Sequence, residues 1–198
     1  MLTCKILRIY NNMSVYILFY LFTFMFAVIH QHNFILLKNR KIFFYKSLFI
    51  FILSIYIGLR DTIGGDWGNY YNDYFLPKVD LSLSNYLKTY IFTKDPLFHL
   101  INYIVANTYP SYYLVNFIFG IIFSFCLVQF SFSLGKPFFA ILISTPVLIT
   151  IVAMGYHRQA LSISFFMIGL IYLNKNNLTK YSFYVFIGCL FHYTAVFL

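Results

Sequence analysis

Long apolar runs dominate this chain, and short polar segments separate them. A helix that crosses a bilayer needs about 20 predominantly apolar residues. Because lipid offers the backbone no hydrogen-bond partners, such runs fold as helices. We therefore expect an all-α fold, a polytopic transmembrane helical bundle forming one membrane-embedded domain over residues 1–198. The spans are expected at about residues 14–37, 43–59, 112–134, 137–154, 158–173 and 181–198.

Three apolar segments have unusual lengths. Residues 137–173 would form a helix of about 55 Å at 1.5 Å per residue, whereas a hydrocarbon core measures roughly 30 Å. The polar quartet at 155–158 is therefore expected at a turn between two spans. Residues 96–107 are too few to span comfortably and predict an interfacial or re-entrant helix beside an outer-face loop. The last run is still apolar at Leu198, which predicts that this is the N-terminal part of a longer protein.

The composition excludes an ordinary soluble domain. The chain is 61% hydrophobic and 10% charged, whereas soluble domains carry roughly 25% charged residues. The net charge of +9 comes from basic residues that lie mostly between apolar runs. That distribution sets membrane topology and argues against nucleic-acid binding. The three cysteines have no metal-ligand spacing. Neither a metal nor a cofactor is expected.

Charge density predicts the orientation in the membrane. Residues 38–46 hold four basic residues in nine positions, whereas residues 60–95 hold four in 36 and also all five acidic residues. The denser basic loop is expected in the cytoplasm, which places the N-terminus outside. With alternating spans, the aspartate loop, the 155–158 turn and His192 share the outer face.

The first two aspartates flank two glycines. Gly64 and Gly65 allow positive φ and a close approach to a ligand or to the next helix. This segment either presents Asp61 and Asp66 into an outer cavity or forms an ordinary turn with a local Asp cap. Two carboxylates without further spaced ligands are thin evidence for a divalent cation.

Aromatic and basic side chains carry the remaining candidate chemistry. Trp67 and Tyr70 belong either to an interfacial aromatic belt or to a surface that stacks on sugar rings. Arg158 would cost at least about 2.5 kcal/mol near the bilayer centre. It either snorkels to the headgroups or binds an anion such as a diphosphate through its forked donors. His157 and His192 are either satisfied core residues or functional groups on the same face.

Four segments occur in an order that matches a known family. They are GLRDTIGGDWGNYYNDYF at 58–75, DPLFHLINYI at 95–104, GYHRQALSISFFMIGLIYL at 155–173 and CLFHYTAVFL at 189–198. With these segments the chain resembles the EpsG family of exopolysaccharide and capsule polymerases, relatives of the Wzy O-antigen polymerases. One position departs from the family pattern G-x-D-T-x-x-Y, because Trp67 replaces the hydroxyl residue.

The resemblance implies a membrane glycosyltransferase. Its substrate would be an oligosaccharide repeat unit on undecaprenyl diphosphate at the outer face of the bacterial cytoplasmic membrane. Membrane lipid, a chain-length regulator and a flippase would be its partners. The implied base is Asp66 or Asp61, with His192 as competitor. The residues implied in substrate binding are Arg60, Arg158, His157, Gly64, Gly65, Trp67 and Tyr70.

Two other functions use the same residues. A flippase or ion-coupled transporter of lipid-linked glycans would use intramembrane Asp, Arg and His as relays. Transport predicts polar groups at several depths, so that access can alternate, whereas a clustered set on one side favours an outer-face enzyme. A structural subunit of the export machinery is the third alternative.

Overall fold

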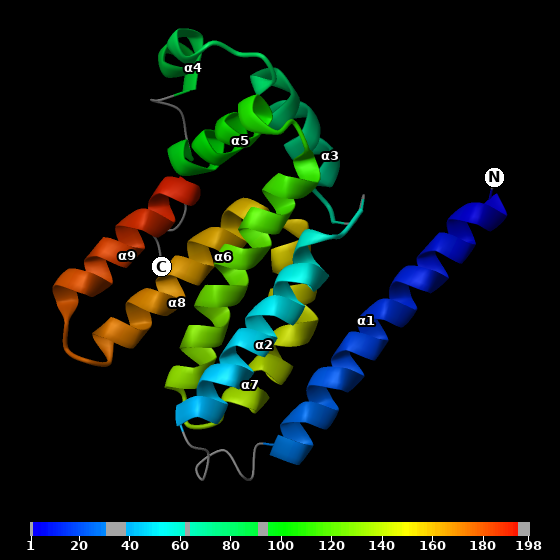
Figure 1. Cartoon of the computed structure of the whole chain (residues 1–198), viewed down its shortest axis with the longest axis vertical. Helices are drawn as coiled ribbons and strands as arrows, with labels where there is room; N and C mark the ends of the chain where they lie inside the picture. The colour runs from blue at the N-terminus through cyan, green and yellow to red at the C-terminus, as the bar shows by residue number, and fades with distance from the viewer. Residues whose placement is uncertain (1, 31–38, 62–63, 91–94, 194–198) are drawn as a thin grey trace.

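The computed structural model describes residues 2–30, 39–61, 64–90 and 95–193, with residues 2–12 as backbone only. Every regular element in these residues is a helix, so the expected all-α fold is confirmed (Figure 1). In chain order the elements are α1 (Leu2–His30), α2 (Asn39–Gly58), α3 (Trp67–Asn69), the π-helix η2 (Tyr70–Phe75), the 3₁₀-helix η3 (Leu76–Lys78), α4 (Leu83–Tyr90), α5 (Pro96–Thr108), α6 (Tyr112–Ser133), α7 (Pro137–Ser144), the π-helix η4 (Thr145–Ala153), α8 (His157–Leu173) and α9 (Leu178–Phe191).

The helices have the dimensions of a membrane protein. Within the described residues, α2, α6 and the Met13–His30 part of α1 are long and apolar enough to cross a bilayer. Shorter apolar helices cover Pro137–Ala153 and Leu178–Phe191. Each overlaps a segment where a span is expected, and the predicted ends at 31–37 and 194–198 lie outside the described residues.

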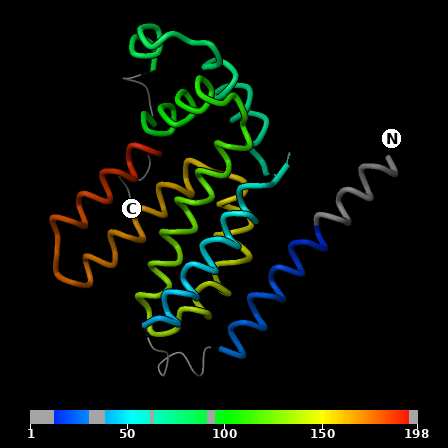
Figure 2. Tube along the Cα trace, in the orientation of Figure 1, coloured from blue at the N-terminus to red at the C-terminus, as the bar shows by residue number. Residues whose placement is uncertain are grey.

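Close helix packing holds the bundle together. Helices α2 and α6 run side by side (Figure 2). A Cβ on Gly58 would lie 2.7 Å from the Phe117 backbone, and one on Gly120 would lie 3.2 Å from the Gly58 nitrogen. Small residues allow this approach, which adds dispersion contacts where lipid supplies no hydrophobic drive. Helix α6 also packs on α8, which pairs with α9, whereas α1 contacts mainly α7 and η4.

The long apolar run at 137–173 divides as expected. The helical segment formed by α7 and η4 ends at Ala153, and α8 begins at His157. Pro146 lies near the start of η4, where it has no N–H to donate to the helical ladder. The polar quartet therefore lies at the break between two helices, and Arg158 is in the first turn of the new helix near the end of the bundle.

A cap of short helices, called the helical cap, covers the end of the bundle at which α6 and α8 begin. Helix α5 lies across the end of α6, and α3, η2 and η3 form a continuous helical stretch beside it (Figure 1). The sequence predicted α5 but neither this stretch nor α4. Short helices in a polar and aromatic segment carry little signal of their own and depend on packing. Tyr86 of α4, for example, stacks on Tyr103 of α5 with ring centroids 4.2 Å apart.

The last helix is shorter than expected, and this corrects the position of His192. Helix α9 ends at Phe191, and His192 has extended backbone angles (φ −155°, ψ 117°). The expectation that His192 lies within the helix is therefore wrong. The next backbone N–H, that of Tyr193, donates to Asp95 Oδ1 at 3.0 Å instead of continuing the helix. A distant carboxylate thus holds the chain where it leaves α9.

Candidate functional site

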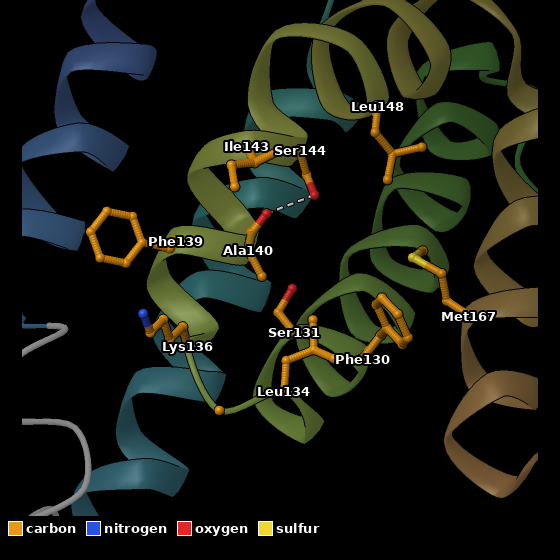
Figure 3. Close-up of a pocket in the computed structure, with 11 residues that line it drawn as sticks. Phe130, Ser131, Leu134, Lys136, Phe139, Ala140, Ile143, Ser144, Leu148 and Met167 are labelled. Atoms are coloured by element: carbon orange, nitrogen blue, oxygen red, sulfur yellow. Dashed lines mark hydrogen bonds between the residues drawn. The ribbon is translucent and has the colours of Figure 1, made fainter. Parts of the chain in front are cut away.

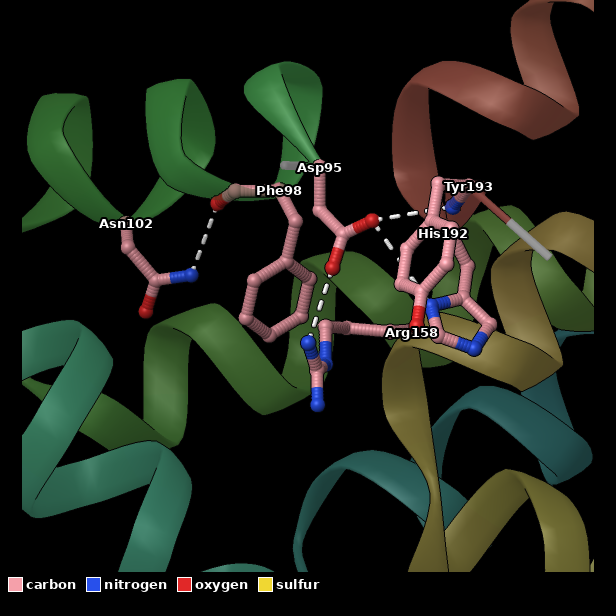
Figure 4. A network of polar contacts seen from close by, with 6 residues as sticks. All are labelled: Asp95, Phe98, Asn102, Arg158, His192 and Tyr193. Carbon is pink, nitrogen blue, oxygen red and sulfur yellow. Dashed lines mark hydrogen bonds and ion pairs between the residues drawn. The ribbon is translucent and has the colours of Figure 1, made fainter. Parts of the chain in front are cut away.

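Asp95 is the centre of a polar cluster that joins three parts of the chain (Figure 4). Its Oδ2 accepts a hydrogen bond from Arg158 Nη1 at 2.8 Å. Its Oδ1 accepts one from the Tyr193 backbone N–H and lies 3.6 Å from His192 Nδ1. The start of α5, the first turn of α8 and the end of α9 therefore meet at one carboxylate.

The local backbone directs this carboxylate away from its own helix. Asp95 is the N-cap residue of α5, with Pro96 as the first helical residue. Its side chain makes no capping hydrogen bond, and its φ of 64° is left-handed, a region that Asp tolerates better than most residues. Asp95 is 1% exposed. A charge this buried is stable only when it is paired, and Arg158 supplies the pairing.

Arg158 is held by aromatic rings as well as by Asp95. Its guanidinium carbon lies 4.9 Å from the Tyr74 ring centroid and 5.7 Å from that of Tyr70. The side chain is 24% exposed. The guanidinium therefore makes a cation–π contact through its face and an ion pair through one of its terminal nitrogens. Arg158 Nε is buried and has no hydrogen-bond partner among the described residues, and the part of the guanidinium that remains exposed can meet an anion.

Arg60 and His157 contact each other, and His157 packs against the Tyr70 ring. Arg60 is 3% exposed, and its Nη2 lies 2.5 Å from His157 Nε2. A guanidinium only donates, so this ring nitrogen accepts and the imidazole is neutral. The His157 ring in turn stacks on Tyr70, with centroids 5.5 Å apart. In the described residues no carboxylate pairs with Arg60, so a buried positive charge remains beneath the site.

The two glycines bring the aspartate loop against the start of α8. Gly64 has φ 112°, and a Cβ there would lie 2.3 Å from the Met154 carbonyl oxygen. A Cβ on Gly65 would lie 3.3 Å from the Tyr156 hydroxyl. The close approach that the glycines predicted is thus to the turn before α8. The sequence segments around 64–66 and 154–158 do converge.

Asp61 and Asp66 occupy different places around the cluster. Asp61 is exposed, and its Oδ1 accepts the Tyr113 hydroxyl at 2.8 Å. Asp66 is half-buried and accepts a long 3.4 Å hydrogen bond from Asn69. Burial raises the pKa of the Tyr70 phenol, Arg158 opposes this rise and Asp66 adds to it. Asp66 and Arg158 therefore both lie near the Tyr70 ring.

The aromatic segment packs mainly on itself. Trp67 stacks on Tyr71 at 5.6 Å and meets Tyr112 edge-on at 5.3 Å. Tyr70 is 2% exposed and packs against Phe98 at 5.4 Å. Tyr70 therefore supports the cluster from within, and the half-buried Trp67 has the more accessible ring.

Two charged residues of this region were not predicted as site residues. Asp95 lies in one of the four family-like segments, and its position directly before Pro96 and α5 was the available signal. Lys78 gave no comparable signal, yet it is fully buried. Its amine donates to the Tyr74 carbonyl and lies 4.4 Å from the Tyr90 ring centroid. Tyr74 therefore contacts Arg158 through its ring and Lys78 through its carbonyl.

Lys78 predicts a pH-dependent stability. Burial lowers the pKa of its amine to about 8 from 10.5. Between these values the unfolded chain binds a proton that the folded chain has released, so the free energy of unfolding rises with pH. Lys78→Met removes this rise. Thermal unfolding of purified protein from pH 7 to 10 should show wild type gaining stability relative to the variant.

The exposed Lys88 provides the control. Lys88→Met should follow wild type across the same range, since a solvated amine has no burial cost to relieve. A constant difference between wild type and Lys78→Met at every pH would contradict the effect of burial on Lys78.

Comparisons with known proteins agree with the sequence motifs. A family model described as the EpsG family matches residues 42–198. This match includes every residue of the cluster and confirms the resemblance of the four segments. No curated protein and no solved structure matches the chain.

Proposed function

The chain belongs to the EpsG family, and we propose that it is a polysaccharide polymerase that joins lipid-diphosphate-linked repeat units. The supporting observation is the cluster in which Arg158 and the Tyr193 N–H donate to the buried Asp95 carboxylate and His192 Nδ1 lies 3.6 Å from it. The half-buried Arg158 guanidinium and the half-buried Asp66 carboxylate both lie near Tyr70 and offer an anion-binding group and a proton acceptor at one end of the bundle. Glycosyl transfer from a diphosphate requires both groups.

The proposed reaction moves the growing glycan to the next repeat unit. A sugar hydroxyl of the incoming lipid-linked unit attacks the anomeric carbon of the growing chain and forms the new glycosidic bond. The bond between that carbon and the diphosphate oxygen breaks, and its electron pair leaves with the diphosphate. The hydroxyl proton passes to the base. The products are a glycan lengthened by one unit on the acceptor lipid and undecaprenyl diphosphate.

The described geometry favours one distribution of roles. Asp66 is the proposed base because it is half-buried and its hydrogen bond from Asn69 is long. Asp61 accepts from Tyr113, and His192 lies beside Asp95, so both are alternatives for this role. Arg158 is the proposed ligand of the diphosphate, whose charge grows as the bond breaks.

Arg60 and His157 support this site from beneath. Both are almost fully buried, so the proposed contribution of Arg60 is a positive potential below the diphosphate. Its hydrogen bond to His157 fixes the imidazole that stacks on Tyr70. Trp67 is proposed to contact sugar, while Gly64 and Gly65 position the loop.

The proposed orientation places the cluster at the outer face of the bacterial cytoplasmic membrane and the N-terminus outside. The basic segment at 38–46 then faces the cytoplasm. Repeat units delivered to the outer leaflet by a flippase would reach the site directly. A chain-length regulator is the proposed protein partner.

The clustering of buried charge favours the enzyme over a transporter. Within the described residues, the buried charged and histidine side chains belong to one region around Tyr70 and Tyr74: Arg60, Lys78, Asp95, His99, His157 and His192. Alternating access would place polar groups at several depths of the bundle. An enzyme at one face needs them at one depth.

Asp66→Asn tests the proposed base. The amide keeps the shape of the side chain and removes the proton acceptor, so we expect chain elongation to fall by roughly 10²–10⁴-fold. The assay is polymer length in cells that lack the native gene, with variant abundance measured in the membrane fraction. Asp73→Asn is the matched control, because Asp73 is an exposed aspartate of the same loop. It should support wild-type polymer.

The location of unpolymerised material separates the two functions. A failed polymerase leaves single repeat units outside the cell membrane, whereas a failed flippase traps lipid-linked units on the inner leaflet. Wild-type polymer from Asp66→Asn at normal abundance would remove Asp66 from the mechanism. Trapped inner-leaflet units would contradict the polymerase itself.

A further inference from the structure

A groove lies far from the Asp95 cluster. It has a volume of about 520 Å³ and is formed by the end of α6, by α7 with the start of η4, and by α8 (Figure 3). Its lining includes Phe130, Phe139, Ile143, Leu148 and Met167. On α6 its lining begins at Phe130, 18 residues beyond the first residue of that helix, Tyr112, which is about 27 Å at 1.5 Å per residue. Ligand pockets commonly occupy 300–1,000 Å³, so the groove can hold part of a ligand.

The charge at this end of the bundle has one sign. All five acidic residues lie between positions 61 and 95, in the polar region at the other end. Lys46 of α2 donates to Gln129 of α6 at 2.8 Å, which places the basic start of α2 beside the groove end of α6. Basic residues also occupy the start of α7 and the α8–α9 turn. The basic residues at this end are Arg40, Lys41, Lys46, Lys136, Lys175 and Lys180.

Two polar groups lie where the groove meets this basic end. Lys136 is an exposed lining residue and the N-cap of α7. The start of a helix carries unpaired N–H groups and a partial positive charge, which add to the lysine charge. Ser131 also lines the groove, and its hydroxyl is buried without a hydrogen-bond partner in the described part of the chain (Figure 3). A buried hydroxyl without a partner favours a ligand that supplies an acceptor.

From these features we propose that the groove binds an anionic phospholipid of the leaflet at this end. One acyl chain lies along the apolar lining between α7 and α8. The phosphate lies against Lys136 and the start of α7, and an ester oxygen accepts from Ser131. This site is independent of the glycan-transfer site. It explains why an apolar groove with an unpartnered hydroxyl and Lys136 opens at the basic end of the bundle.

Lipid retention by the purified chain tests this site. The full chain is stripped of lipid in detergent, incubated with phosphatidylglycerol or phosphatidylcholine of equal chain length, and examined by native mass spectrometry. Wild type should retain one phosphatidylglycerol in preference to phosphatidylcholine. Lys136→Gln should lower that preference about fivefold, which is the effect of one lysine near an anionic surface. Ala140→Trp, which fills the groove, should lower retention of both lipids.

Matched variants distinguish the groove from general surface binding. Lys175→Gln removes a basic residue at the same end that does not line the groove, and Ile121→Trp adds the same ring to an exposed position of α6 that does not line it either. Both should retain lipid as wild type does. Equal loss from Lys136→Gln and Lys175→Gln, or equal loss from the two tryptophan variants, would overturn the site. Equal retention of the two lipids by wild type would also overturn it.

Discussion

Asp95→Asn is expected to lower chain elongation by roughly a hundredfold or more while the protein remains in the membrane. The amide keeps the volume of the side chain but loses the charge that pairs with Arg158 at 2.8 Å. It also offers one oxygen where Arg158 and the Tyr193 N–H now use two. A shift of about 1 Å in a group that binds substrate can cost about 10²-fold in rate. Polymer length and variant abundance in cells provide the measurement.

Asp95 is proposed as a positioning residue, so its test must exclude a general loss of folded protein. The double variant with Arg158→Lys supplies that readout. If Asp95 acts through Arg158, Asp95→Asn should cost little more activity once Arg158 is replaced, because residues in one network are not additive. Asp73→Asn is again the control for the substitution. Full additivity would show that Asp95 does not act through Arg158. Wild-type polymer from Asp95→Asn would show that elongation does not depend on Asp95.

The long helices were predictable because their signal is local. An apolar run of sufficient length forms a helix wherever it lies, since the bilayer removes the alternatives. The length of the 137–173 run required a break, and the polar quartet at 155–158 placed it before α8. The cap was less predictable, because α4 and the stretch from Trp67 to Lys78 depend on contacts with α5, such as that of Tyr86 with Tyr103. The end of α9 was mispredicted because a residue 98 positions away in the sequence binds the next N–H.

The same difference between local signals and tertiary contacts explains which site residues could be predicted from the sequence. Arg158 stood out because a cation within an apolar run has a high local cost. Asp95 lies in a mixed segment where an aspartate carries no such cost, and its partner is 63 positions away. Lys78 was missed for a related reason, since its burial under Tyr74 and Tyr90 arises only when the loop folds onto α5. A sequence thus reveals charges that conflict with their immediate surroundings more readily than charges buried by tertiary structure.

Arg158→Lys should lose elongation by at least about a hundredfold, although it keeps the positive charge. In the structure one arm of the guanidinium binds Asp95, and its face lies 4.9 Å from the Tyr74 ring centroid. The planar fork can therefore hold Asp95 and still present donors to a diphosphate. A lysine ammonium is a single compact charge that cannot bridge both partners in this way.

The control for Arg158→Lys is Arg40→Lys, an exposed arginine at the other end of the bundle. It should leave polymer length unchanged, because a solvated arginine has no fork geometry to lose. Purified protein and lipid-linked repeat units would allow rates to be compared at equal protein concentration. A simple charge requirement at position 158 predicts near-normal elongation by Arg158→Lys. The proposed forked contact with a departing diphosphate predicts a loss that added substrate does not restore, because the missing interaction strengthens as the bond breaks.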